Sequence, residues 1–304
     1  MSTPSLTPVY LKLVLTTAFW GGTFIAGRHV AQQMPHFLAA SGRFLIALVP
    51  LFLFTLTVGG GLGRLNRRQL VGTVLLGATG VFTYNTFFLG GLAYIPASRA
   101  ALIVALSPIM TMVVMRFIAH EHWTWLRVAG VLMSLAGVSM VITRGDYASA
   151  FSGAVGRGEL YIFIAVAAWV AYTVIGRYTL AGMSAAAATT WSTLWGVLML
   201  MVPAGAELMS PALVRPDAWS WVAMAYLGVF GTAMAFFWYN QAVAAIGPAR
   251  ATLFTNLVPV FAVVLSVALL GERLVIASLV GGAMVIGGVI LANRPGAVKR
   301  AEAD

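Results

Sequence analysis

Residues 18–28 read AFWGGTFIAGR and residues 167–177 read AAWVAYTVIGR, so a tryptophan stands eight positions before an arginine in both segments. An offset of 149 residues places Trp20 on Trp169 and the Gly-Arg pair of the first segment on that of the second. A sequence that recurs at a fixed offset indicates an internal repeat, which decides the architecture before any single motif does. The rest of the chain is therefore interpreted as two copies of one unit.

The composition places this repeat in a membrane. Of 304 residues, 61% are hydrophobic and 9% are charged, and the mean hydropathy is +0.93. Soluble domains carry about 25% charged residues. A helix needs about 20 mainly apolar residues to cross the hydrocarbon layer, and the absence of alternation argues against a β-barrel. Ten such runs are found, at about residues 9–27, 36–58, 69–91, 97–117, 124–143, 158–178, 184–205, 217–240, 249–270 and 274–293.

Cysteine content and charge exclude several classes of protein. The chain has no cysteine and four scattered histidines, so we expect no disulfide and no metal site. The net charge of +10 comes from Lys and Arg spread along short connections, which disfavours a nucleic-acid partner. These charges are more numerous at one set of helix ends than at the other. The positive-inside rule then predicts that both termini are cytoplasmic.

Each copy of the repeat comprises five runs. An offset of 151 residues aligns the fourth and fifth runs with the ninth and tenth, and an offset of 155 aligns Tyr84-Asn85 with Tyr239-Asn240. We therefore predict an all-α integral membrane protein with ten transmembrane helices, in repeats at 9–143 and 158–293. Because five is odd, the second copy enters the membrane from the opposite side, and the two repeats are inverted. Inverted repeats create two similar gates around a central site, which favours transport by alternating access.

At this point the chain resembles a known family over about residues 10–293. FWGGTF in the first run, a proline in each of the fourth and ninth runs, and Gly271-Glu272-Arg273 are similar to the drug/metabolite transporter superfamily, specifically its EamA-type exporters. The first-half counterpart of the last motif, at residues 120–122, reads HEH and keeps only the glutamate. The resemblance implies export of a small molecule. Within the superfamily the chain is similar to exporters of aromatic amino acids in the bacterial inner membrane, where we expect this protein to lie.

Aromatic and small polar groups are the candidates for substrate contact, because none of the eight Asp and Glu falls in the middle of a run. Helical spacing puts an aromatic side chain and small groups on one face of both the first and the sixth runs. Pro108 and Pro259 each free a backbone carbonyl four residues earlier, which predicts a hinge or helix break that exposes polar backbone. Packing without a ligand is the alternative at each position. The predicted substrate-binding residues are Trp20, Trp169, Thr23, Tyr172, Ser107, Thr252, Thr255 and Asn256.

A second set of residues could control entry and exit. Tyr-Asn pairs fall late in the third and eighth runs, with interhelical hydrogen bonding as the alternative role. An arginine begins each of the fourth and ninth runs, with anchoring at the membrane surface as its alternative. Arg43 is interpreted as structural. The gate candidates are Tyr84, Asn85, Tyr239, Asn240, Arg99 and Arg250.

Small residues recur on one face of the fifth and tenth runs. They allow two helices to approach closely, and we interpret them as packing within one chain and expect a monomer. The residues are Gly130, Ser134, Gly137, Gly281 and Gly288.

These observations favour a carrier over the other classes considered. A membrane enzyme would need acids, histidines or metal ligands within the runs, and a receptor has less reason to contain an inverted repeat. We expect no cofactor, and as partners only the lipid bilayer and a small-molecule substrate. Tryptophan, tyrosine and small polar groups suit aromatic and other large neutral amino acids, moved by facilitated diffusion or exchange. The alternative is export of lipophilic cationic drugs coupled to an ion gradient, through cation-π contacts with the tryptophans.

Overall fold

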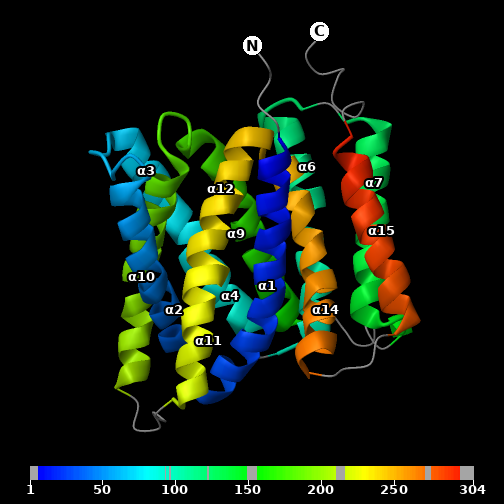
Figure 1. The fold of residues 1–304 in the computed structure, drawn as a ribbon, viewed down its shortest axis with the longest axis horizontal. Coiled ribbons are helices and arrows are strands. Elements are labelled where there is room, and N and C mark those ends of the chain that lie inside the picture. Colours follow the sequence, from blue (N-terminus) through cyan, green and yellow to red (C-terminus); the bar gives the residue numbers. More distant parts are fainter. Residues whose placement is uncertain are drawn as a thin grey trace.

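The computed structural model describes residues 6–92, 94–95, 97–121, 123–148, 156–209, 216–270 and 275–294. All regular secondary structure in these ranges is helical, and Figure 1 shows the helices standing side by side. The elements are α1 (Thr7–Gln33), α2 (His36–Thr57), α3 (Arg67–Leu76), η1 (Gly77–Thr83), α4 (Tyr84–Leu92), α5 (Ala97–Val104), α6 (Ser107–Ile118), α7 (Trp125–Thr143), α9 (Arg157–Thr179), α10 (Ala185–Leu208), α11 (Ala218–Gly228), η2 (Val229–Met234), α12 (Ala235–Ile246), α13 (Pro248–Leu253), η3 (Phe254–Leu257), α14 (Val258–Leu270) and α15 (Ile276–Ala292).

Every apolar run of the sequence is helical in the structure. Eight helical segments within the described ranges are long and apolar enough to cross a membrane. The helices of the other two runs are shorter than that length. The fourth is divided into α5 and α6, and the tenth, α15, has 17 residues. The protein is therefore an all-helical, multi-span membrane protein.

Polar caps fix where several helices begin. The Asn66 side chain accepts a hydrogen bond from the backbone N–H of Gln69 at 2.9 Å, and Ser184 Oγ accepts one from Ala187 at 3.1 Å. Each cap satisfies a backbone donor that has no partner within its helix. Pro108 lies in the first turn of α6, where a missing N–H costs nothing. The chain therefore starts a new helix at Ser107 after α5 ends at Val104.

Two π-helical turns, η1 and η2, interrupt the third and eighth runs at corresponding places. A Cβ on Gly80 of η1 would lie 2.3 Å from Tyr172, and one on Gly231 of η2 would lie 2.7 Å from Thr23. Only glycine permits such close approach to the facing helix. Turns of this kind are frequent at functional sites, because they widen the helix and free backbone groups.

Helices of one half pack mainly against helices of the other. Helix α1 contacts α11, α12 and α14, and α9 contacts their counterparts α3, α4 and α6. Helix α2 also packs against α10, and α7 packs against α15. In Figure 1 the members of each pair run in opposite directions, and the start of α1 lies at the same edge as the end of α15.

The α7–α15 pair is held by glycines in backbone contact. A Cβ on Gly137 would lie 2.6 Å from the carbonyl oxygen of Gly281, and one on Gly130 would lie 2.6 Å from that of Gly288. The small faces noted in the sequence thus lie against each other within the chain.

Candidate substrate cavity

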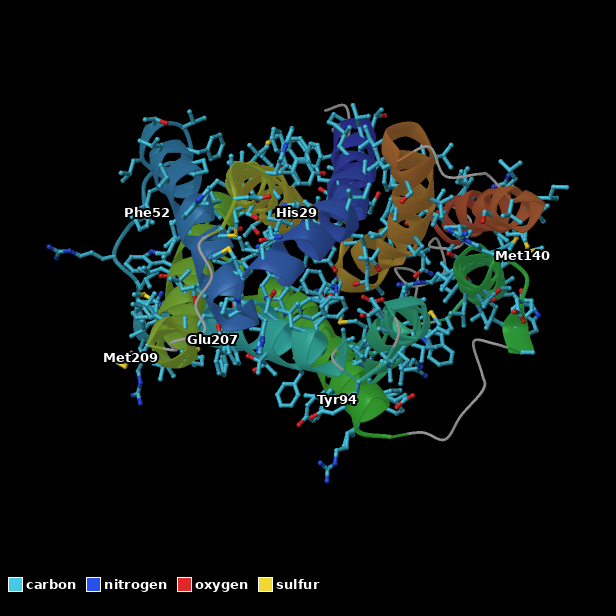
Figure 2. All side chains as sticks on the ribbon, turned by 90° about the horizontal axis from the view of Figure 1, so that it is seen from below. His29, Phe52, Tyr94, Met140, Glu207 and Met209 are labelled. Carbon is cyan, nitrogen blue, oxygen red and sulfur yellow. The ribbon has the colours of Figure 1, made fainter. Side chains whose placement is uncertain are left out.

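A cavity of about 1090 Å³ opens between the two halves. The helices that contribute to its wall are α1, α2, α4, α5, α6, α9, α11, η2, α12, η3 and α14. His29 and His36, with side chains 38% and 49% exposed, line it where α1 ends and α2 begins. Figure 2 views the molecule from this end, with His29 labelled. Binding pockets for small molecules measure about 300–1,000 Å³, so the cavity has room for an amino acid and water.

Aromatic rings form one side of the cavity. Trp20 and Trp169 line it with ring centroids 5.4 Å apart in an edge-to-face arrangement, and Tyr84 lies 5.4 Å from Trp169. Trp20 Nε1 donates a hydrogen bond to the carbonyl of Gly231, 3.0 Å away in η2. The paired tryptophans of the repeat therefore meet each other across the two halves, and a backbone group of the π-turn fixes one of them.

An arginine and an asparagine form a polar group on the same wall. Arg43 Nη2 donates to Asn85 Oδ1 at 2.8 Å, and Asn85 Nδ2 donates to the carbonyl of Val81 at 2.6 Å. The guanidinium also lies over the ring of Phe44, 4.6 Å from its centroid. Among the described residues that line the cavity, none is Asp or Glu.

The two divided helices bring further polar groups to the cavity. Ser107 Oγ donates to the carbonyl of Val104, and Thr255 Oγ1 donates to that of Thr252 at 2.6 Å. Asn256 Nδ2 donates to Ser134 Oγ at 3.0 Å, while Asn256 Oδ1 is buried without a partner. A buried amide oxygen without a hydrogen bond is costly, and a ligand donor would relieve that cost.

Four predicted residues, all buried, do not line the cavity in this conformation. Asn240 Nδ2 donates to Tyr172 Oη and to Thr189 Oγ1, both at 2.8 Å, and Tyr239 Oη shares hydrogen bonds of 3.0 Å with Thr173 and Thr252. This network lies behind the aromatic wall, with Tyr172 stacked on Trp169 at 5.2 Å and Tyr239 5.2 Å from the same ring. The residues concerned are Tyr172, Tyr239, Asn240 and Thr252.

The remaining predicted residues occupy mixed positions. Nine of them line the cavity: Trp20, Thr23, Trp169, Ser107, Thr255, Asn256, Tyr84, Asn85 and Pro259. Pro108 is buried away from it, and Arg250 is half-buried and does not line it. The side chain of Arg99 and the residues of Gly271-Glu272-Arg273 lie outside what the structure describes.

The opposite end of the molecule is closed by polar and aromatic contacts. Glu121 accepts hydrogen bonds of 3.2 Å from Arg127 and from Arg177, which joins the α6–α7 connection to the end of α9. Lys12 Nζ donates to Gln241 Oε1 at 2.8 Å, and Tyr10 stacks on Phe254 at 5.7 Å. The cavity is therefore reached from the end marked by His29 and not from the end marked by Glu121.

Arg43 lines the cavity, although the sequence did not place it among the candidate binding or gate residues. Its side chain is half-buried there. Its position within an apolar run was a usable signal, because charged residues inside a membrane mark functional sites.

A bundle of membrane-length helices around a solute-sized cavity defines a membrane transport protein. The chain belongs to the EamA-like transporter family, whose sequence profile matches residues 7–143 and 156–294.

Relatives match the chain over nearly its full length. The "Uncharacterized transporter YyaM" of Bacillus subtilis is 29% identical over 94% of this chain and 93% of its own length. The "Probable terminal-alkyne amino-acid exporter" of Streptantibioticus cattleyicolor is 30% identical over 96% and 95%. The "Uncharacterized inner membrane transporter YedA" of Escherichia coli K12 is 28% identical over 88% and 85%. A crystal structure at 22% identity superposes with a TM-score of 0.78 over 94% of this chain and 97% of the other, which shows a shared fold.

Proposed function

We propose that this protein exports aromatic and other large neutral amino acids, as zwitterions, across the bacterial inner membrane. Transport proceeds by alternating access without obligatory coupling to an ion gradient. The observation that carries the proposal is a cavity whose wall has an aromatic part and a polar part. Trp20 and Trp169 form the aromatic part, and Arg43, Asn85 and the helix breaks form the polar part. Aromatic rings suit an apolar side chain, and the polar groups suit the two charged ends of an amino acid.

The pattern of helix contacts supports alternating access. Contacts made by α1 are repeated by α9 with the halves exchanged, and the α2–α10 and α7–α15 pairs are antiparallel, as expected for two inverted repeats of five helices each. Tyr84 and Asn85 line the open cavity, whereas Tyr239 and Asn240 do not. We propose that these equivalent pairs exchange environments during transport.

The relatives support the substrate class and the location. The Streptantibioticus cattleyicolor relative is named as a probable amino-acid exporter, and the Escherichia coli relative as an inner membrane transporter. From the positive-inside rule we propose that both termini lie in the cytoplasm, and the intramolecular α7–α15 seam is compatible with a monomer.

Uptake into liposomes tests the proposal. Purified protein would be given labelled Phe, Trp, Thr or a lipophilic cation without an ion gradient, in wild type and in Trp20→Ala. Saturable equilibration of Phe and Trp, lost in the variant, is expected. Movement only under a pH or Na⁺ gradient would contradict the uncoupled mechanism, and movement of the cation alone would favour drug export.

A further inference from the structure

We infer that Arg43 binds the carboxylate of the substrate and that Asn85 positions it. This inference rests on the proposed function and narrows it, because it makes a carboxylate group, and not the ammonium group, the required feature of the substrate.

The first argument is charge. A guanidinium stays protonated in proteins, and a half-buried charge is costly unless an opposite charge meets it. Asn85, the residue to which Arg43 donates, is neutral. No acidic side chain in the described part of the chain forms an ion pair with Arg43 or lines the cavity. A ligand carboxylate would provide the missing negative charge.

The second argument is geometry. A guanidinium has five N–H donors in a planar fork that matches a carboxylate, and Arg43 gives one of them to Asn85. Burial leaves Nε without a partner. Asn85 is itself fixed, since its Nδ2 donates to the carbonyl of Val81 in η1 and its Oδ1 thereby faces Arg43. With Phe44 beneath it, the guanidinium is oriented before a ligand arrives.

The third argument is asymmetry. The offset of 149 residues that aligns α1 with α9 makes Ser192 the equivalent of Arg43 in the second half. Ser192 is buried in α10 and donates to the carbonyl of Thr189 at 3.0 Å. Within the described structure, only the first half therefore presents a cation to the cavity from this helix. A single anchor of this kind would hold the substrate carboxylate in one orientation, with the side chain left to the tryptophans.

The test compares three ligands that differ only in their charged ends. Phenylalanine carries both ends, 3-phenylpropionate only the carboxylate, and phenethylamine only the ammonium. Each would be measured by saturable uptake into liposomes and by the rise in unfolding temperature of the purified protein, for wild type, Arg43→Gln and Arg43→Lys. Arg116→Gln is the matched control, because Arg116 is exposed at the end of α6 and does not line the cavity.

Arg43→Gln is expected to raise the half-saturating concentration of both carboxylates at least tenfold, since charge-assisted bonds to a guanidinium are strong. Arg116→Gln should leave it unchanged, and phenethylamine should bind Arg43→Gln at least as well as wild type. Arg43→Lys should recover part of the loss, because it keeps the charge without the fork. If Arg43→Gln does not fold, the comparison uses Arg43→Lys and Asn85→Ala, the second of which removes the positioning bond and leaves the guanidinium in place.

Failure of this inference and failure of the proposed function give different results. Equal half-saturation of phenylalanine in wild type and Arg43→Gln would overturn the inference and leave amino acid transport standing. If wild type transports none of the three ligands, the proposed function fails. The shift in unfolding temperature with 3-phenylpropionate, compared between wild type and Arg43→Gln, would still decide whether Arg43 binds carboxylates.

Discussion

The ion pair between Glu121 and Arg177 should control which end of the protein is open. It links the α6–α7 connection of the first half to the end of α9 in the second half, at the closed end of the cavity. Arg127 also pairs with Glu121, but both lie in the first half, so that contact does not join the halves. We predict that Glu121→Gln and Arg177→Gln both favour opening at this end.

The size of the effect follows from exposure and distance. The side chains of Glu121 and Arg177 are 25% and 42% exposed, and the two atoms are 3.2 Å apart. Partly exposed ion pairs of this kind contribute about 0.2–1 kcal/mol. If the ion pair exists only while this end is closed, its loss should raise the ratio of molecules open at this end to molecules closed at it by up to ~5-fold. Arg127→Gln should have a smaller effect, and the double variant Glu121→Gln/Arg177→Gln should add nothing to either single one.

Because the chain has no cysteine, an introduced cysteine is the single thiol, and its labelling rate reports how accessible that position is. Thr252→Cys introduces a single thiol at a fully buried position bonded to Tyr239, away from the open cavity. Its labelling rate by a maleimide in the purified protein should rise in the Glu121→Gln and Arg177→Gln backgrounds by the factor above. Ala101→Cys, on the wall of the open cavity, should label no faster in these backgrounds than in the wild-type background. Unchanged or slower labelling of Thr252→Cys in both backgrounds would refute the reasoning.

Three further predictions concern the wall, the seam and acid stability. Trp20→Ala removes the ring and its bond to η2 and should raise half-saturation at least tenfold in liposome uptake, whereas Trp20→Phe keeps the ring and should lose less; equal losses would contradict a role for the ring. Gly137→Ala forces a contact of 2.6 Å and should cost about 1–3 kcal/mol. In Gly205→Ala the new methyl group meets no atom within 4 Å, and this variant should stabilise the protein by up to ~1 kcal/mol. The unfolding temperatures of the two variants in detergent test this, and an equal rise in both would contradict close packing between α7 and α15. Hydrogen bonds from Ser220 lower the pKa of Asp217 to about 2, so its stabilising effect is present above the unfolded pKa of about 3.9 and is lost as pH falls toward 2. The unfolding temperature of Asp217→Asn should therefore fall less than that of wild type between pH 5 and pH 2 in an acid series, and parallel curves would exclude this cap.

Hydropathy predicted the helical segments well because the membrane sets a required length. The ten runs coincide with helical segments, and a proline explains why the fourth is divided at Ser107. The π-turns were not predicted, since they leave no clear pattern beyond glycines such as Gly80 and Gly231. Their presence depends on the helix that faces them, which is a tertiary effect.

The site was predicted less completely, for two reasons. Helical spacing identifies which residues share a face, but not whether that face meets a cavity or another helix, so Tyr172 and Thr252 were grouped with Trp20 although they lie behind the wall. A repeated sequence also predicts equal environments, whereas one conformation opens one end only. Arg43 has no basic counterpart in the second half, so the repeat does not single it out, and the sequence alone gave it only a structural role.

The glycine seam between α7 and α15 has a mechanical consequence. Carbonyl oxygens meet α-carbons along it, so the two helices cannot slide past each other or separate without breaking many contacts at once. One helix ends each half of the chain, and both stand at one side of the bundle in Figure 1. The seam can thus act as a fixed pivot, about which the two halves rotate while they stay in contact. In the proposed alternating access, a tilt about this seam would widen one end of the cavity as it narrows the other, which would keep the membrane sealed.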